Sequence, residues 1–219
     1  GLQRHGDGGR GRHGDGGRLR HGDGGHPRHG DGGRGRQDPD PILVLATGGT
    51  FDKEYDEIRG RLYFRRTHLP EMLALGRSRL PTRLRVLMLK DSLDLKEADR
   101  RRILSACERS RERRIIITHG TDTMCETALY LGRRITDKTI VLTGAMVPYT
   151  FGSSDGVFNL GSSLAFVQTL PPGVYVAMNG RFFVWHAVVK NRITGVFEHR
   201  PVTPARHKEV PGLRHRQPS

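Results

Sequence analysis

Four short stretches of this sequence contain hydroxyl side chains, carboxylates or glycines, residue types that together can hold or attack a small polar molecule. Glycines let backbone N–H groups approach closely, which could serve either a phosphate or a reacting carbonyl. No lysine follows a GxxxxG spacing, and GxGxxG is missing after the first apolar run, so a nucleotide site is disfavoured. The stretches are 47–50 (TGGT), 90–92 (KDS), 118–122 (THGTD) and 144–148 (GAMVP).

Each of these stretches directly follows a short run of apolar and β-branched residues. Such runs, alternating with helical patterns, predict an α/β fold: a mainly parallel sheet flanked by helices, with Rossmann-like or flavodoxin-like layering. Ligands in these folds bind at the carboxyl ends of the strands, so the four stretches should meet at one edge of the sheet. The expected strands are 42–46, 86–89, 115–118, 139–143 and 174–178.

Capping residues predict three helix starts. Asp94 with Glu97 has the spacing of a capping box, and Thr123 with Glu126 repeats that spacing. Asp155 precedes a third helix, whose apolar residues recur at helical spacing and predict one buried face. This buried stripe is Leu160, Leu164 and Val167.

The two ends of the chain differ in composition from the part between them. Residues 1–40 repeat HGDGG with a period of eight residues and offer no apolar face, so we expect this segment to be disordered. Residues 200–219 hold four prolines and five cationic side chains, and we expect a second disordered, basic tail. Residues 41–199 are the expected folded domain.

The formal net charge of +14 raises the question of a nucleic-acid partner. The excess is spread over all three segments, and the arginine clusters at 100–102 and 109–114 have no interleaved aromatic residues for stacking on bases. Charge patterning favours a solvated helix face. A nucleic-acid partner is therefore disfavoured, although a polyanion binder that uses its basic ends stays an alternative.

Cysteine content and hydropathy give no sign of a metal site, a cofactor or a membrane. Cys107 and Cys125 lack the spacing of a zinc site or of a disulfide framework. No apolar run reaches 18 residues, and the first residues contain no signal-peptide core. We therefore expect a cytoplasmic protein with no metal, no cofactor and no membrane partner.

The order of the motifs resembles one family closely. TGGT after a strand, then ITHGTDTM, VLTGAMVP and SSDGVFNL is the order found in the bacterial-type L-asparaginases and asparaginase/glutaminases. The resemblance covers about residues 42–198 and is to the amino-terminal domain only. It implies hydrolysis of the side-chain amide of L-asparagine through an acyl-enzyme, with Thr50 as the nucleophile and Gly49 beside the substrate.

The resemblance also implies a second catalytic set, formed by Thr121, Asp122 and Lys190. Burial would favour a neutral lysine amine, whereas the neighbouring carboxylate would favour the charged form. Whether Lys190 moves a proton or only holds Thr121 in place therefore stays open. By the same resemblance, Ser92 and Asp122 contact the α-carboxylate and α-amino groups of the substrate, and the backbone of Ala145 contacts the amide. His119 is interpreted as a structural hydrogen-bonding residue.

A lid tyrosine is a further family feature with two candidates here. Tyr55 lies five residues beyond Thr50 and is the first choice, and Tyr63 is the rival. Either could instead be an ordinary exposed tyrosine.

Two departures from the full-length members stand out. Leu93 follows Ser92, where many members carry a glutamine that helps to hold the α-carboxylate. The chain also ends about 20 residues after Glu198, so it resembles short, single-domain members that lack the second domain and its acidic residue. That acid would have to be supplied by the oligomer, by a lid residue such as Glu54, or not at all.

An assembly of subunits is expected because a single domain must close an active site at its rim. We expect a homodimer or homotetramer, the closed assemblies that are commonest. The segment 157–168 is the candidate interface, since it adds Phe158 and Phe166 to the stripe that faces the sheet. The alternative is a helix buried on all sides within one subunit.

Two alternative functions stay open on the same scaffold. One methylene discriminates substrates by only about 1–3 kcal/mol, so the sequence does not separate asparagine from glutamine, and a glutaminase-leaning amidase is possible. The other alternative is a module that senses an amino acid without turnover. The intact set of Thr50, Thr121, Asp122 and Lys190 argues against it.

Overall fold

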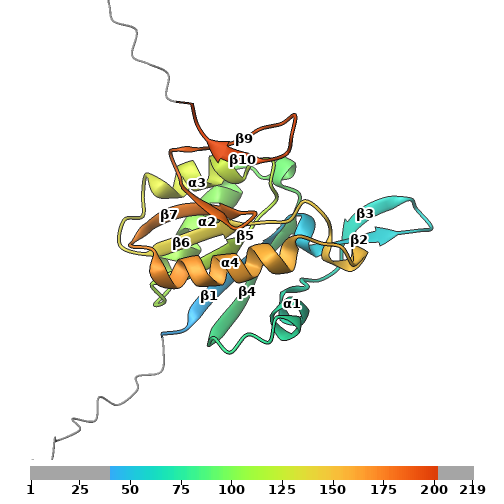
Figure 1. The fold of residues 1–219 in the computed structure, drawn as a ribbon, viewed down its shortest axis with the longest axis horizontal. Helices are drawn as coiled ribbons and strands as arrows, with labels where there is room; N and C mark the ends of the chain where they lie inside the picture. Colours follow the sequence, from blue (N-terminus) through green and yellow to red (C-terminus); the bar gives the residue numbers. More distant parts are fainter. Residues whose placement is uncertain (1–39, 202–219) are drawn as a thin grey trace, which may run out of the picture. The chain divides into compact units, whose positions relative to one another are not determined.

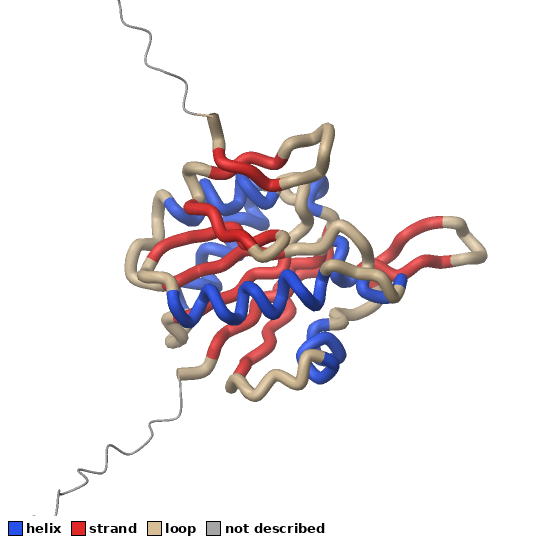
Figure 2. The backbone as a smooth tube through the Cα atoms, in the orientation of Figure 1, coloured by secondary structure: helices blue, strands red, loops and turns tan. Residues whose placement is uncertain are grey.

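The computed structural model describes residues 40–201, which are built around a six-stranded sheet (Figures 1 and 2). The predicted octad repeat and basic tail fall almost entirely outside the described residues. The strand order is β4-β1-β5-β6-β7-β8; the first five strands are parallel and β8 is antiparallel to β7. The predicted α/β fold is confirmed. The strands are β1 (Ile42–Gly48), β4 (Thr82–Lys90), β5 (Arg114–Thr118), β6 (Thr139–Thr143), β7 (Gly173–Met178) and β8 (Arg181–Val184).

The central strands are buried on both faces, which is why they read as continuous apolar runs. In β5, the consecutive residues Ile115, Ile116 and Ile117 are all fully buried. The edge strand β4 starts four residues before its predicted start at position 86. Its first half alternates between exposed arginines and aliphatic side chains, a pattern that a search for apolar runs misses.

Helices cover both faces of the sheet. Helices α2 (Glu97–Arg109) and α3 (Met124–Gly132) pack on one face, and α1 (Leu69–Leu75) and α4 (Gly156–Thr169) pack on the other (Figure 1). Alternate side chains of β1 enter the two cores, as expected for a strand with a period of two residues. The predicted stripe of α4 is buried in the second core.

Two of the three predicted helix starts are confirmed, and one is wrong. Thr123 precedes α3 and Asp155 precedes α4, but neither side chain caps its helix, and the hydroxyl of Thr123 donates instead to the carbonyl of Ser92 at 2.8 Å. Helix α2, however, begins at Glu97 itself, because Asp94 belongs to a preceding 3-10 turn, η2 (Ser92–Asp94). The carboxylate that caps α2 belongs to Asp99, which accepts a hydrogen bond from the backbone N–H of Lys96 at 3.0 Å.

Lys138 ties the other end of α2 to the body of the domain. Its buried ammonium group donates to the carbonyl oxygens of Cys107 at 2.7 Å and of Ser110 at 2.6 Å. The Cys107 carbonyl also accepts from the backbone N–H of Ser110 at 3.3 Å, so Lys138 adds a charged donor at the end of the helix, where a cation interacts favourably with the helix dipole.

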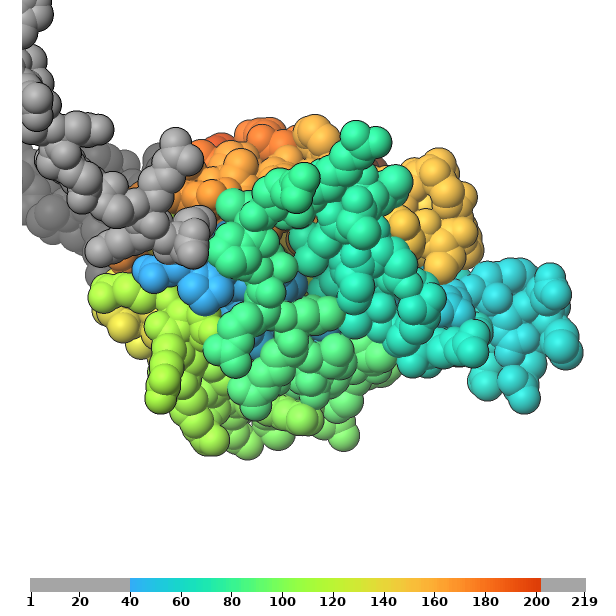
Figure 3. Space-filling model, turned by 90° about the horizontal axis from the view of Figure 1, so that it is seen from below, coloured from blue at the N-terminus to red at the C-terminus, as the bar shows by residue number. Residues whose placement is uncertain are grey.

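Smaller elements extend from the ends of the main strands. A hairpin of β2 (Lys53–Asp56) and β3 (Arg61–Phe64) projects from one end of the domain, as Figures 1 and 3 show. A second two-stranded sheet is formed by β9 (Val188–Lys190) and β10 (Phe197–His199). Two further 3-10 turns are η1 (Thr50–Asp52) and η3 (Tyr149–Phe151).

Within residues 40–201, no helix is long and apolar enough to cross a bilayer. Cys107 is buried in the α2–α3 core and Cys125 is half-buried, and neither forms a disulfide. Burial raises the pKa of the Cys107 thiol to about 12, so this cysteine is a packing residue and not a nucleophile.

Candidate active site

The two glycines of the TGGT loop allow the end of β1 to approach two neighbouring strands. Gly48 has φ +99° and Gly49 has φ +85°, in the region that favours glycine. A Cβ atom on Gly48 would lie 2.4 Å from the backbone nitrogen of Lys90, and one on Gly49 would lie 2.4 Å from the backbone nitrogen of Gly120. The loop that carries Thr50 is therefore in direct contact with the loop that carries Thr121.

Backbone and side-chain hydrogen bonds hold these loops in place. The hydroxyl of Thr47 donates to the carbonyl of Thr118 at 2.6 Å. The backbone N–H of His119 donates to the carbonyl of Thr143 at 2.8 Å, which joins the THGTD loop to the end of β6. The three loops at the carboxyl edge of the sheet thus form one connected unit.

The structure brings Thr121, Asp122 and Lys190 together. The Nζ of Lys190, at the end of β9, lies 2.8 Å from Thr121 Oγ1 and 2.7 Å from Asp122 Oδ1. The lysine side chain is 12% exposed and the aspartate 47%, so the amine is shielded while the carboxylate faces solvent. The predicted proximity is confirmed, and the catalytic roles of these residues stay a prediction.

His119 lies at the centre of the same loop but is a structural residue. Its Nδ1 is 2.8 Å from the carbonyl of Gly120 and its Nε2 is 2.9 Å from Thr127 Oγ1. Because the carbonyl can only accept, Nδ1 carries the proton and Nε2 accepts from the threonine hydroxyl. Complete burial lowers the pKa of His119 to about 4, so the ring is neutral at pH 7 and both nitrogens are occupied.

Ser92 and Asp91 follow β4 and face the TGGT and THGTD loops. Ser92 Oγ is buried, has no hydrogen-bond partner among the described residues and packs against Gly120. Asp91 pairs with the ammonium group of Lys53, just beyond Thr50. Partial burial opposes ionisation of Asp91, but the hydrogen bonds from Lys53 and from the backbone of Leu93 hold the pKa of Asp91 below its usual value.

Ala145 lies on the loop after β6 and is fully buried, so only its backbone can serve a substrate. The start of α4 fixes this loop. Asp155 accepts hydrogen bonds from the backbone N–H groups of Met146 at 2.9 Å and Val147 at 3.1 Å, and Asn159 donates to the carbonyl of Gly144 at 2.9 Å.

The two candidate lid tyrosines lie on opposite faces of the β2–β3 hairpin. Tyr55 pairs with Leu62 across the hairpin and is 55% exposed. Tyr63 pairs with Glu54 and donates to its carboxylate at 3.1 Å, which raises the pKa of Tyr63. Since side chains alternate between the faces of a strand, the two tyrosines cannot present the same face to the site.

A polar cluster anchors the base of this hairpin. The backbone N–H of His68 donates to the buried carboxylate of Asp52 at 2.9 Å, and the Nε2 of His68 lies 3.2 Å from Glu54 Oε1. Burial raises the pKa of Asp52. The hydroxyl of Thr150, in η3, donates to the carbonyl of Lys53 at 3.3 Å and connects the hairpin to the loop after β6.

Sequence reasoning assigned no role in the site to four residues that shape it, and predicted only a helix start for one of them, Asp155. These residues are Lys53, Asp91, Asp155 and Asn159. Each lies inside or beside a motif that sequence reasoning had already singled out. The charged and amide side chains are evident in the sequence, but the sequence does not show which residues they contact. Their partners lie up to 38 residues away in the chain, as for Lys53 and Asp91. In the described part of the chain, no three His, Cys, Asp or Glu side chains are grouped so that they could hold a metal ion.

Comparison with known proteins identifies the family. The family model described as "Asparaginase, N-terminal" matches residues 41–202, about three quarters of the chain.

The chain belongs to the asparaginase N-terminal domain family.

Individual asparaginases are similar over shorter spans. The chain is 46% identical over 80 residues to a glutaminase-asparaginase of Acinetobacter glutaminasificans, covering 35% of this chain and 24% of that protein. It is 42% identical over 85 residues to L-asparaginase 2 of Escherichia coli, covering 37% of this chain and 24% of that protein. The matched region is thus about a quarter of the length of these relatives.

A solved structure extends the likeness to most of the described domain. The thermostable L-asparaginase from Thermococcus kodakarensis matches with a TM-score of 0.64 and 30% identity, over 73% of this chain and 51% of that chain. The fold of this L-asparaginase is therefore shared over 73% of the chain, and the match spans about half of the solved relative.

Proposed function

We propose that this protein is an amidohydrolase that converts L-asparagine to L-aspartate and ammonia, with Thr50 as the nucleophile. The observation that carries the proposal is the hydrogen bond between Lys190 and Thr121, on a loop packed against the Thr50 loop. A threonine hydroxyl is a weak nucleophile and needs a neighbouring group to take its proton. The Thr121 hydroxyl, hydrogen-bonded to the shielded Lys190 amine, is suited to taking that proton.

The proposed reaction has two steps, formation of an acyl-enzyme ester and its hydrolysis. Thr50 Oγ1 attacks the side-chain carbonyl carbon of the substrate, and its proton passes through Thr121 to the neutral Lys190 amine. The lysine then gives that proton to the amide nitrogen, which leaves as ammonia. Water attacks the resulting ester and gives one proton to the Lys190 amine, which returns it to Thr50 Oγ1 as aspartate is released. The backbone of the Gly49 loop and of Ala145 lies beside the proposed amide position and orients the amide. The N–H of Gly49 itself donates to the carbonyl of Lys90 at 3.0 Å, so the oxyanion would have to be stabilised by another N–H group of this loop.

Groups at the rim are suited to an α-amino acid. The carboxylate of Asp122 is half-exposed. Its Oδ1 accepts a hydrogen bond from Lys190, and the exposed part of the carboxylate can also contact an α-ammonium group. Within residues 40–201, Ser92 Oγ is buried without a partner, and a buried hydroxyl of this kind favours a bound polar group such as an α-carboxylate. Leu93 is 68% exposed and offers no polar contact in place of the family's glutamine.

The acid that full-length members draw from a second domain has a candidate substitute within the hairpin. Glu54 accepts a hydrogen bond from Tyr63 and lies beside His68. Tyr55 stays the proposed lid tyrosine because it follows Thr50 most closely, and Tyr63 with Glu54 is the alternative.

A second copy of the chain is the proposed partner, as a homodimer or homotetramer. Helix α4 is not buried on all sides: Phe158 is 61% exposed, and Phe166 packs edge-on against Phe182 of the edge strand β8 at 5.2 Å between ring centres. Together Phe158, Phe166 and Phe182 form an apolar surface, the α4–β8 face, that a subunit contact would cover.

The test is ammonia release from L-asparagine and L-glutamine by the full chain and by its Thr50→Ala variant. We expect turnover by the wild-type chain and less than about a tenth of it in the variant, which removes the nucleophile. A thermal shift with asparagine but no ammonia would instead indicate the non-catalytic sensing module. Comparable turnover of the two amides would indicate an asparaginase/glutaminase.

A further inference from the structure

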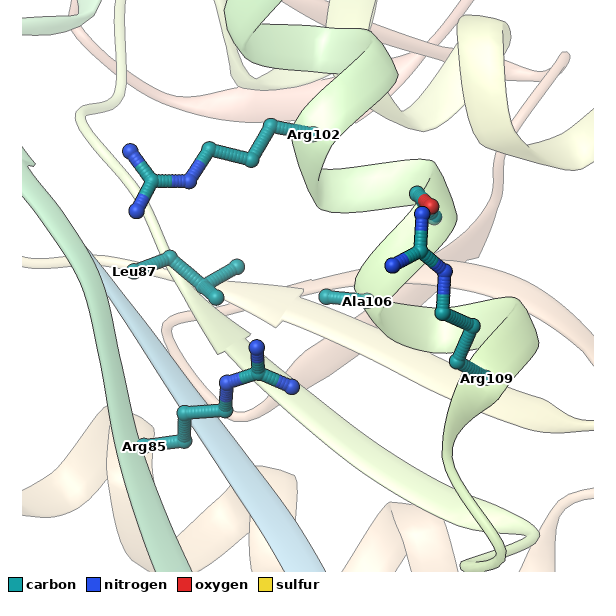
Figure 4. A pocket seen from close by; sticks show the side chains of 6 residues that line it. Arg85, Leu87, Arg102, Ala106 and Arg109 are labelled. Carbon is teal, nitrogen blue, oxygen red and sulfur yellow. The ribbon is translucent and has the colours of Figure 1, made fainter.

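A cavity away from the candidate active site lies between the edge strand β4 and helix α2, with three arginines around it (Figure 4). Its volume is about 240 Å³. Leu87 of β4 and Ala106 of α2, both buried, form its apolar floor. Arg85, Arg102 and Arg109 extend around that floor and are exposed at its mouth.

The spacing of these residues explains why they meet. Arg85 and Leu87 are two residues apart on β4 and share the face that packs against α2. Arg102 and Arg109 are seven residues apart on α2, close to two turns, so they share one side of the helix. Ser105 lies between them and adds a hydroxyl to the wall.

Carboxylates do not neutralise these three arginines. Among residues 40–201, Arg85, Arg102 and Arg109 form no ion pair, and no acidic residue lines the cavity. Neighbouring arginines on the same two elements do have acidic partners. These pairs are Arg83 with Glu112 at 2.7 Å, Arg100 with Glu126 at 2.7 Å and Arg101 with Glu97 at 2.9 Å.

The concentration of unpaired charge at one cavity has an electrostatic cost in the folded protein. Three guanidinium groups around one small floor repel one another, and a bound anion removes that repulsion. A second depression of about 470 Å³ has Arg85 and Arg109 as walls as well, and it adds Arg83 and Arg111. Its one acid, Glu112, is already engaged by Arg83 and by Ser110. Positive charge therefore continues beyond the first cavity.

We propose that this arginine cavity binds the phosphate groups of a small oligophosphate, either free or carried by a nucleotide. Guanidinium groups on several sides match a tetrahedral group with several charged oxygens, whereas a planar carboxylate is satisfied by a single guanidinium fork. Aromatic side chains do not line either depression, so a long nucleic acid would find no stacking platform.

Calorimetric titration of the full chain with tripolyphosphate tests the proposal. Arg85→Gln/Arg102→Gln removes two walls of the cavity, and Arg65→Gln/Arg192→Gln removes the same charge at exposed positions outside both depressions. We expect the dissociation constant to rise at least about tenfold in the cavity variant and to stay within about twofold in the control. Equal weakening in both variants, or no binding by the wild-type chain, would overturn the proposal.

Arg102→Lys gives a second readout that does not depend on losing charge. It keeps the positive charge but lacks the planar fork, so tripolyphosphate should bind about threefold or more weakly. Thermal unfolding checks that each variant is folded. An unchanged dissociation constant in this variant would show that only general charge attraction is at work, contrary to the proposal.

Three further titrants define the ligand class. ATP binding more tightly than tripolyphosphate identifies a nucleotide as the source of the phosphates, and weaker binding identifies the free oligophosphate. Citrate offers comparable charge on carboxylates and should bind at least about tenfold more weakly than tripolyphosphate. Citrate or hexaglutamate that binds as tightly as tripolyphosphate would overturn the phosphate assignment and point to an acidic peptide.

Discussion

The Nζ of Lys190 lies 2.8 Å from the Oγ1 of Thr121, although 69 residues separate the two in the chain. In the structure the lysine nitrogen donates to the threonine oxygen, and this hydrogen bond must reverse when Thr121 passes a proton to a neutral Lys190 amine. The contact depends on the pairing of β9 with β10, which places Lys190 over the start of α3. A short accessory sheet thus brings Lys190 to the candidate site, most of whose other residues lie on loops at the carboxyl edge of the central sheet.

Thr121→Val should lower turnover by about a hundredfold or more, because it removes a hydroxyl that passes a proton. Thr118→Val is the matched control, since its buried Oγ1 has no partner among the described residues and a valine there keeps the shape. Ammonia release and thermal unfolding should be measured for both variants. Normal turnover with reduced stability in Thr121→Val would show that the hydroxyl is only structural.

Tyr55→Phe should reduce turnover by about a hundredfold, and Tyr63→Phe should change it by less than about threefold, if Tyr55 is the lid tyrosine. Because the two side chains lie on opposite faces of the hairpin, the substitutions are separable. Steady-state kinetics with asparagine decides between them. The reverse result would assign the role to Tyr63, with Glu54 as its acidic partner.

Stability should fall as the pH drops from about 6.5 towards 4 because of His119. Its folded pKa of about 4 is below the ordinary value of 6.5, so the unfolded state binds the proton first as the pH falls. The slope from this group approaches about 1.4 kcal/mol per pH unit within that window, and its contribution is absent above it. Urea unfolding at several pH values measures this slope, which should be smaller in His119→Gln. An equal slope in the variant would contradict the prediction.

Lys138→Met should lower the free energy of unfolding by about 2–4 kcal/mol, because it leaves the carbonyls at the end of α2 without their charged donor. Lys96→Met, an exposed lysine at the other end of the same helix, should change it by less than about 0.5 kcal/mol. Urea unfolding of both variants provides the comparison. Similar losses in the two would rule out the role of Lys138 as a helix cap.

Phe158→Asp should shift the protein towards monomers and lower activity per subunit at a fixed concentration, because it places a charge in the α4–β8 face. Leu75→Asp changes another exposed apolar side chain, on α1, and should leave the assembly intact. Light scattering and activity over a dilution series provide the measurement. A wild-type monomer with full specific activity would refute the assembly.

The sequence by itself determined the central sheet and the positions of its loops. Strands such as β5 and β6 are buried on both faces, so they carry uninterrupted apolar runs, and their ends are marked by a change to polar residues and glycine. The resemblance to one family then predicted that Thr50, Thr121 and Lys190 share one site; the contact of Lys190 with Thr121 is observed, and the role of Thr50 stays a prediction. The strands can be predicted from local apolar runs, and the site from the order of the motifs. Neither prediction needs knowledge of side-chain contacts.

Only the tertiary structure decided which distant side chains meet. The β2–β3 hairpin and the first half of β4 are exposed on one or both faces, so they lack the apolar runs that mark a strand. The pairing of Tyr63 with Glu54 follows from the hairpin register, and that of Lys53 with Asp91 from the approach of β1 to β4. The three arginines of the β4–α2 cavity converge for the same reason: strand and helix spacing fixes their faces, but only packing places those faces together.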